Sequence, residues 1–399
     1  MVAVALGLVV TLAVLIMQAK LTRQNVRASD TSLRDNEARA AMDVIARELT
    51  GGGFLHAGTT GACAAVLQFN SSAPAPNYFV SYPVAAMAAS ANTRLPFVAS
   101  PGITLNYPAT SSVNRSDVLI VRSTSDATQF GSATTPLISV TENSAYAPLI
   151  TGVLPFSSSP VPLLTNGDVG VLQTKVGTAP LQSIACLRVP VTTLGTLAGS
   201  TSMSSSGALM PTNFYSGFSA QLGLLGLGGN ILSDPQLQMS SQFINLGAAA
   251  ATNQRIFAYF VDADPAKYQW PTLVRATINP LTDLEVANSR QELAAGIVSF
   301  QVLFGIGTPS AGVSQYQTWA AAVAAGNTPN IMTVKIMVLS RSIYPDNGFS
   351  NALTNGVVNI RSQFGQTGYT NYTIPSGEIS NHFVAQEAEL VVRSSLWLK

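Results

Sequence analysis

The chain has 399 residues, of which 47% are hydrophobic and 10% charged, against roughly 25% charged residues in an ordinary soluble domain. Its 20 basic and 19 acidic residues nearly cancel, so no net field would hold a polyanion, and we predict no nucleic-acid partner. The hydrophobic content excludes a disordered chain. With two His and two Cys, metal ligands and catalytic bases are scarce, so we expect no enzyme activity, cofactor or metal.

The charges are distributed unevenly along the N-terminal segment. Residues 2–17 carry no charge, whereas residues 20–48 hold eleven charged side chains. The apolar run would form about 24 Å of helix, short of the roughly 20 residues that cross a hydrocarbon core. It is therefore either the core of a signal peptide or a membrane helix without its first turns. Gln18-Ala19-Lys20 is a poor cleavage site, which favours the membrane helix.

The helical pattern continues beyond the apolar run. No Pro interrupts it, Gly51–Gly53 would end it, and apolar residues recur at Leu21, Val26, Leu33, Met42, Ile45 and Leu49. We predict one helix over residues 1–50, with a transmembrane part at 1–19 and an amphipathic part at 20–50. The polar face would expose Arg23, Arg27, Arg39, Asp43 and Arg47. The residues expected to face lipid or a filament core are Val2, Leu6, Val9, Val10, Leu12, Val14, Leu15 and Ile16.

The orientation of this helix poses a conflict. Lys20, Arg23 and Arg27 follow the apolar run, which by the positive-inside rule would place the body in the cytoplasm. The body is instead rich in Ser, Thr, Gly and Asn and poor in charge, as in an extracytoplasmic domain. A basic leader preceding Met1 in a precursor would remove the conflict.

The body, residues 51–399, is predicted to be one β-rich head. Segments rich in β-branched and aromatic residues, bounded by Pro, Gly or Asp, predict strands at 117–122, 255–261, 272–278, 297–304 and 332–339. Trp319 amid alanines predicts a short helix over 315–325. The Ser-, Thr-, Gly- and Pro-rich stretches 155–162 and 199–230 predict long loops.

Three patterns in the body admit a chemical interpretation, and each has a simpler one. Gly226-Leu-Gly228-Gly229 lacks the spacing and the preceding strand of a dinucleotide loop, so a plain loop is favoured. Asp262 and Asp264 could bind Ca²⁺, but further oxygen ligands are missing and a turn fits better. His56 and His382 lie far apart in sequence and indicate no metal site.

The N-terminal segment resembles the helix of type IV pilins just after their usual start, and the chain resembles the PilW class of minor pilins. The resemblance continues in the order expected for that class through the body segments 116–122, 166–169, 291–297, 334–342 and 390–393. It implies an α+β fold, with a pilin-like N-terminal α-helix, membrane-spanning in its first part, packed on a large β-rich globular head with long loops. The leader, the mature Phe and the Glu at the fifth mature position are not in this sequence, so prepilin cleavage remains an implication of the family.

The resemblance also implies a function and partners. PilW-type proteins act with other minor pilins and the major pilin to prime pilus assembly, near the tip, in support of twitching motility and surface attachment. It implies processing by prepilin peptidase, and residence in the inner membrane with the head in the periplasm before transfer to the cell surface. Two alternatives remain open: a minor pseudopilin of type II secretion, and an unrelated anchored surface adhesin or enzyme.

An extracytoplasmic head would mature under oxidising conditions, where Cys63 and Cys186 can form a disulfide. That bond would close a loop of about 120 residues, worth up to about 4–5 kcal/mol in the chain-entropy model. Two separate free thiols are the alternative. The scarcity of charge further predicts that the head owes little of its stability to ion pairs.

Overall fold

The computed structural model describes part of the chain, and all structural statements below refer to that part. The described residues are 2–51, 66–70, 77–82, 84–89, 114–124, 138–140, 153–155, 166, 168–176, 183–190, 193–197, 200–204, 241–248, 254–278, 285–308, 310–346 and 356–392.

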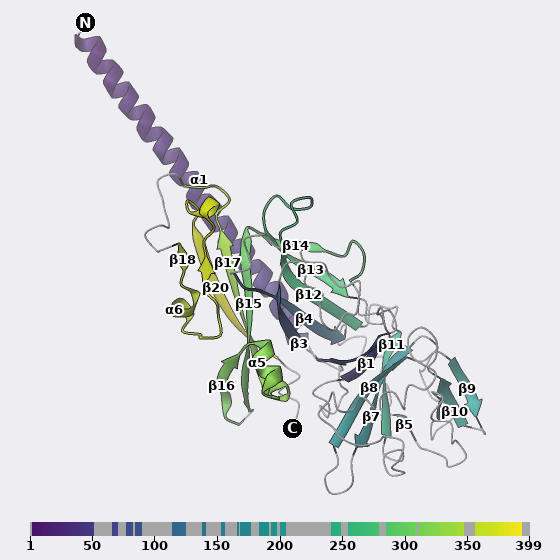
Figure 1. The fold of residues 1–399 in the computed structure, drawn as a ribbon. Coiled ribbons are helices and arrows are strands. Elements are labelled where there is room, and N and C mark those ends of the chain that lie inside the picture. The colour runs from purple at the N-terminus through teal and green to yellow at the C-terminus, as the bar shows by residue number, and fades with distance from the viewer. Residues whose placement is uncertain are drawn as a thin grey trace.

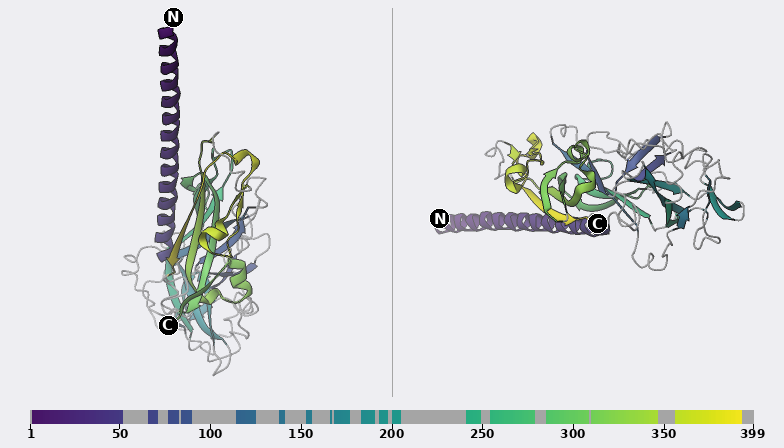
Figure 2. Two further views of the ribbon diagram at one scale, coloured as in Figure 1. Left: turned by 90° about the vertical axis from the view of Figure 1, so that its left-hand side faces the viewer. Right: turned by 90° about the horizontal axis from the view of Figure 1, so that it is seen from below.

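A single long helix, α1 (Val2–Gly51), forms the N-terminus. Its bounds confirm the predicted helix to within one residue, and it ends at the first of the three glycines. The first half projects from the molecule, and the second half lies along the head (Figures 1 and 2). The residues of the second half that face the head are spaced three or four apart, as a helix requires: Ala38, Ala41, Met42, Ile45 and Leu49.

One side of the head is a five-stranded antiparallel sheet in the order β14-β13-β12-β4-β3. Its strands are β3 (Val84–Ala89), β4 (Ser116–Thr124), β12 (Gln254–Asp262), β13 (Thr272–Ile278) and β14 (Gln291–Ala295). The predicted strands at 117–122, 255–261 and 272–278 are thus confirmed, the last with identical bounds.

The other side is a four-stranded antiparallel sheet in the order β16-β15-β17-β20. Its strands are β15 (Ile297–Thr308), β16 (Gly312–Gln317), β17 (Ile331–Arg341) and β20 (Phe383–Val391). The predicted strands at 297–304 and 332–339 are confirmed and are longer than expected.

The chain passes from one sheet to the other at Gly296, which joins β14 to β15. Its φ of +74° lies in the left-handed region, and a Cβ there would meet the Arg341 carbonyl oxygen at 2.9 Å. A side chain would therefore push β17 away from the crossing. Glycine at this position lets the two sheets and α1 meet closely.

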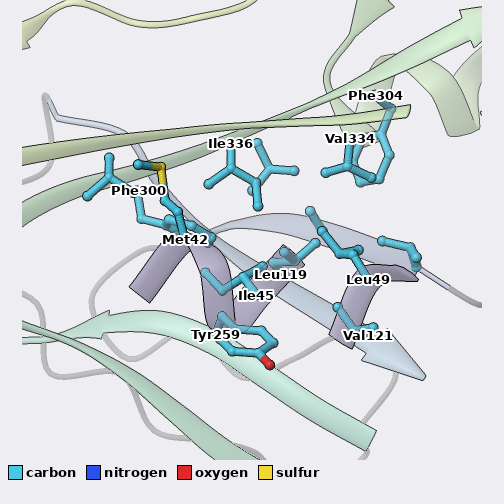
Figure 3. Close-up of a cluster of buried hydrophobic side chains, with 14 of the residues drawn as sticks. Met42, Ile45, Leu49, Leu119, Val121, Tyr259, Phe300, Phe304, Val334 and Ile336 are labelled. Carbon is cyan, nitrogen blue, oxygen red and sulfur yellow. The ribbon is translucent and has the colours of Figure 1, made fainter. Parts of the chain in front are cut away.

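The two sheets face each other across one hydrophobic core, and α1 is part of that core. Figure 3 shows Met42, Ile45 and Leu49 of the helix between two groups of side chains, one from each sheet. Leu119, Val121 and Tyr259 come from the five-stranded sheet, and Phe300, Phe304, Val334 and Ile336 come from the four-stranded sheet. The edge strands β14 and β20 and the strands β4 and β17 all contact α1. The second half of α1 therefore fills the opening between the two sheets.

A second apolar layer covers the outer face of the four-stranded sheet. The segment 356–379 contributes α6 (Ile360–Phe364), β18 (Val357–Val358), β19 (Tyr372–Thr373) and the short η5 (Ser376–Glu378). Ile360, Tyr369, Tyr372 and Ile374 pack there against residues of β15 and β17. Both faces of this sheet are thus buried, which explains why β17 is buried along its whole length.

Two further sheets lie at the end of the head away from the N-terminus (Figure 1). A six-stranded sheet has the order β2-β1-β8-β7-β11-β5, and a three-stranded sheet has the order β6-β10-β9. Their strands are β1 (Val66–Asn70), β2 (Asn77–Ser81), β5 (Ile138–Val140), β6 (Val153–Pro155), β7 (Asp168–Val176), β8 (Ser183–Pro190), β9 (Thr193–Leu197), β10 (Ser200–Ser204) and β11 (Ser241–Ala248).

Two expectations from the sequence need correction. The predicted helix at 315–325 is wrong in its first part, because residues 312–317 form β16 and α5 spans only Trp319–Ala324. Thr318 caps that helix by accepting a hydrogen bond from the Ala321 amide. The loop predicted at 199–230 is wrong at its start, where Ser200–Ser204 form β10 by pairing with β6 and β9. Pairing with two neighbouring strands satisfies the backbone N–H and C=O groups of these Ser and Thr residues, so a strand forms although the composition is typical of a loop.

The described helices include none whose apolar stretch is long enough to cross a bilayer. The α+β class and the β-rich head are confirmed, whereas the membrane-spanning first part of α1 is not. The assignment of 1–50 and 51–399 as separate domains also stays a prediction.

Candidate functional site

The first candidate surface is the free half of α1, residues 7–29. Over residues 8–17 apolar side chains are exposed all around the helix, at 49–59% of their full area for Val10, Leu12, Val14, Leu15 and Ile16. These are five of the eight residues predicted to face lipid or a filament core. The side chains of Val2, Leu6 and Val9 lie outside the described part of the chain. A helix that is apolar all round is stable only in lipid or against other helices.

Polar contacts define where the free half ends. Asp30 accepts a hydrogen bond from the Ile343 amide at 3.2 Å, and Arg34 donates to the Ala295 carbonyl at 3.4 Å. The Gln386 side chain of β20 donates to Asp35 on the neighbouring flank of the helix. This set of contacts, which we call the collar, fixes α1 to the ends of both sheets.

The C-terminal part of α1 is held by apolar packing together with one charged pair. Glu48 lies 3.7 Å from Arg275 of β13, whose guanidinium also stacks over the Phe257 ring at 4.6 Å. Burial raises the pKa of the Glu48 carboxyl, and Arg275, Arg255 and Arg47 oppose that rise. The other charged residues predicted on the polar face, Arg39, Asp43 and Arg47, are exposed as expected. The side chains of Arg23 and Arg27 are not described.

A buried ion pair ties the two sheets together. Asp117 of β4 is fully buried and receives two hydrogen bonds from Arg115, at 2.8 and 2.5 Å, and one from the Val302 amide of β15 at 2.8 Å. Arg115 also donates to the Gly368 carbonyl at 2.8 Å. Burial raises the pKa of the Asp117 carboxyl, against the opposing effect of Arg115. These contacts connect both sheets to the outer segment 356–379.

Two side chains near this ion pair, Asn114 and Gln301, each form two hydrogen bonds with the backbone of the outer segment 356–379. The Asn114 amide donates to the Thr373 carbonyl and accepts from the Thr373 amide, both at 2.7 Å. Gln301 makes the same exchange with Thr370, at 2.9 and 2.8 Å. Each buried amide thus satisfies a loop backbone group that would otherwise be unpaired.

Three further charged groups of the head are paired and largely buried. Arg290 binds Asp262 at 2.5 Å and Glu285 at 2.7 Å, Lys335 lies 3.4 Å from Glu387 and 3.7 Å from Glu389, and Arg341 pairs with Glu378. The expectation that ion pairs matter little to the head therefore needs qualification. The charges are few, but several of those described in the head form buried or half-buried pairs.

The described residues that the sequence offered as metal or catalytic candidates make structural contacts instead. Asp262 and Asp264 form the predicted turn, each accepting a hydrogen bond from the amide two residues later, at 3.1 and 3.0 Å. Because Asp262 is also paired with Arg290, its carboxylate is not open to a cation. His382 lies 3.5 Å from Asp346. His56 and the segment 226–229 fall outside the described residues. Within the described ranges, no group of three or more His, Cys, Asp or Glu is arranged to hold a metal.

Cys186 is buried in β8, where it pairs with Gln173 of β7, and it is not a free thiol. Cys63 lies outside the described part of the chain. The bond between the two therefore stays a prediction.

Sequence reasoning missed the Arg115–Asp117 pair and the cluster around Lys335. A signal was present, because in a body with so few charges an isolated charge beside an apolar strand needs a partner in the fold. The sequence does not reveal which partner, since Val302 and Gly368 lie nearly 200 residues or more from Asp117.

One family model matches the chain, over residues 258–376, and its description is Type IV Pilus-assembly protein W. The matched region runs from β12 to η5 and includes most of the four-stranded sheet and its outer layer. No curated protein and no solved structure matched. Over residues 258–376 this match bears out the resemblance to the PilW class that the sequence predicts, and the family described by that model implies a role in type IV pilus assembly.

Proposed function

We propose that this protein is a non-enzymatic minor pilin that takes part in initiating type IV pilus assembly, at or near the pilus tip. The observation that carries the proposal is the division of α1. Its second half belongs to the head core, while its first half exposes apolar residues that the described part of the chain leaves uncovered. The PilW match supports the same role.

The free half of α1 would act in two environments in turn. Before assembly its apolar side chains would lie in the inner membrane, with the head in the periplasm. During assembly the same side chains pack against the helices of other minor pilins and the major pilin, so lipid contacts are exchanged for protein contacts. The head keeps its own core throughout, because that core does not depend on the free half.

The remaining elements of the proposal follow from this cycle. Prepilin peptidase would release the mature N-terminus, and the assembled head would be displayed at the cell surface, supporting twitching motility and attachment. In the oxidising periplasm Cys186 would be bonded to Cys63, which would tie the six-stranded sheet to the segment that follows α1.

The proposal is tested by placing one charge on the free half. Leu12→Asp in the full chain, expressed in a deletion strain, is expected to reduce surface pili at least about tenfold, because an isolated carboxylate is costly both in lipid and among packed helices. Pili are counted by electron microscopy and by shearing. Val323→Asp, at an exposed apolar residue of α5, is the matched control and is expected to leave piliation unchanged.

Normal piliation in the deletion strain itself would refute the assembly role. If pili were normal but a secreted enzyme accumulated in the periplasm, the type II pseudopilin would be the correct assignment instead. Equal loss from Leu12→Asp and Val323→Asp would show that the helix is not the surface that acts.

A further inference from the structure

One histidine lies close to the collar. His382 directly precedes β20, and its Nε2 lies 3.5 Å from Oδ2 of Asp346. The Asp346 side chain is 12% exposed and the His382 side chain 38% exposed, so the carboxylate is largely removed from water while the ring still reaches it. Histidine is the side chain that ordinarily changes its charge between about pH 5 and pH 8. Among the described residues His382 is the only histidine, because His56 falls outside them.

Backbone hydrogen bonds join the two segments that carry this pair. We call these segments the clasp: residues 342–346, which follow β17, and residues 380–382, which precede β20. The Ser342 amide donates to the His382 carbonyl at 2.8 Å, and the His382 amide donates to the Ser342 hydroxyl at 3.0 Å. The Asp346 amide donates to the Ser380 carbonyl at 2.6 Å. The His382 and Asp346 side chains thus face each other across a short paired region.

The clasp also holds α1. The Ile343 amide, between Ser342 and Asp346 in the chain, donates to the Asp30 carboxylate of α1 at 3.2 Å. That carboxylate is itself fixed, because Arg34 lies 3.5 Å from it and the Asp30 side chain is only 9% exposed. Whatever loosens residues 342–346 therefore loosens the hold of the head on α1 at the collar.

The charged groups of the elements around the clasp have partners of their own. Asp30 of α1 is paired with Arg34, Arg341 of β17 with Glu378 of η5, and Glu387 of β20 with Lys335. Residues 347–355, which follow Asp346 in the sequence, include no charged side chain. Carboxylates, lysine and arginine ordinarily keep their charge between about pH 5.5 and pH 7.5. His382 is thus the group of the clasp that is expected to change its charge in this range.

We propose that the clasp is a pH-sensitive fastening of α1 to the head, which closes more tightly when His382 is protonated. The protonated ring is a cation beside the Asp346 carboxylate, and their attraction adds to the hydrogen bonds of the clasp. The neutral ring offers the carboxylate one neutral hydrogen bond at most. The attraction is complete in mild acid and is lost as the pH rises and the ring gives up its proton.

The consequence is local to the junction between the head and the free half of α1. With residues 342–346 held more tightly, the Ile343 amide stays bound to Asp30 for a larger fraction of the time. The junction is therefore stiffer at about pH 5.5 than at about pH 7.5. The inference concerns the fold of this chain alone and does not rest on the proposed function, so either can fail without the other.

Amide hydrogen exchange of the full chain in detergent, followed by NMR, tests the inference. The rate for the Ile343 amide is divided by the rate of an unfolded amide at the same pH, which gives its protection. We expect this protection to be about threefold higher at about pH 5.5 than at about pH 7.5, as suits a half-exposed ion pair. The reference is the Ala325 amide, which donates to the Ala321 carbonyl at 3.0 Å in α5 and should not change. Equal protection of Ile343 at both pH values would overturn the inference.

Two variants assign the pH dependence to the pair. His382→Gln keeps a side-chain N–H donor without a titrating charge, and Asp346→Asn keeps the size of the carboxylate without its charge. We expect both to show the same Ile343 protection at the two pH values, at the lower level of the parent protein, with the Ala325 reference unchanged. If the parent's pH dependence persisted in His382→Gln, another group would be responsible and the inference would fail. Should the glutamine variant not fold, Asp346→Asn makes the same comparison.

Discussion

The two halves of α1 are one continuous helix, yet they occupy opposite environments. Leu49 is completely buried between two sheets, whereas Leu33, four turns earlier, is half exposed on the opposite flank. The first half is apolar on every side up to Met17, and the described residues leave these side chains exposed. The second half is apolar on one side only, and the head covers that side. Hydropathy alone therefore does not say whether an apolar residue serves the fold or awaits a partner, but its angular distribution does.

The largest expected effect is a change in the free energy of unfolding when one leucine in each half of α1 is replaced by alanine. Leu49→Ala leaves a cavity between the sheets, and we expect a loss of about 3–5 kcal/mol of unfolding free energy. Leu33→Ala is expected to cost less than about 0.5 kcal/mol, since no packing is lost. Urea unfolding of the full chain in detergent, followed by tryptophan fluorescence, measures both. Similar losses for the two variants would remove the distinction between the halves.

The next effect concerns the buried Arg115–Asp117 pair, which connects the two sheets that enclose the second half of α1. Asp117→Asn removes the charge that Arg115 and the Val302 amide bind, and leaves a partly buried guanidinium without its counter-charge. We expect a loss of about 3 kcal/mol in the same assay. Asp43→Asn, at an exposed acidic residue of α1, serves as the control and should change little. Because the Asp117 pair is buried, added salt should not reduce the cost of its removal, and a strong salt dependence would argue against burial.

The predicted disulfide lies outside the contacts that hold α1 and should have an effect of similar size. Cys186→Ser is expected to cost about 2–4 kcal/mol, and Cys63→Ser should cost the same if the two are bonded. The double variant would then cost no more than either single one. Unequal losses, or additive ones, would mean that the two cysteines act separately.

The smallest effect is a pH dependence at the outer face of the four-stranded sheet. Burial by itself would raise the pKa of the Glu389 carboxyl, but hydrogen bonds from Tyr316 and Thr333 and the charge of Lys335 together lower it. A lowered pKa in the folded state contributes stability that is complete above the ordinary value of 4.5 and is lost as pH falls through the folded-state value.

Glu389→Gln removes this contribution. The difference in stability between the parent protein and the variant should be below about 1 kcal/mol at pH 7, because the side chain is more than a third exposed. It should shrink further as the pH is lowered below 4.5. Urea midpoints at a series of pH values measure it, and a difference that grows in acid would contradict the assigned direction.

Much of the secondary structure could be predicted from local pattern. The helix bounds followed from the absence of Pro and the glycines at 51–53, and β12, β13, β15 and β17 followed from runs of β-branched and aromatic residues. Such signals are local, so a single sequence carries them. The error at residues 315–317 has the same origin, because Gln-Tyr-Gln has no strong preference and pairing with β15 decides its conformation.

The arrangement of the elements and the internal contacts of the head could not be predicted. That α1 enters the space between two sheets depends on edge strands β14 and β20, which come almost 90 residues apart in sequence. The Asp117 site depends on Val302, and the collar depends on Ile343 meeting Asp30. Each is a long-range contact, and no periodicity within either segment encodes its partner. The apolar residues of the free half, in contrast, are recognisable from the sequence because they need no partner within the chain. That they face lipid or a filament core stays a prediction.

Amide hydrogen exchange along α1, in the full chain in detergent, tests the central claim most directly. Residues 18–29 follow the apolar run and precede the collar, whereas residues 38–49 lie in the core. We predict that amides in 38–49 exchange only through global unfolding, as slowly as those of β15 and β17, and that amides in 18–29 exchange at least about a hundredfold faster. Equal protection of the two segments would contradict the division of α1 into a core half and a free half.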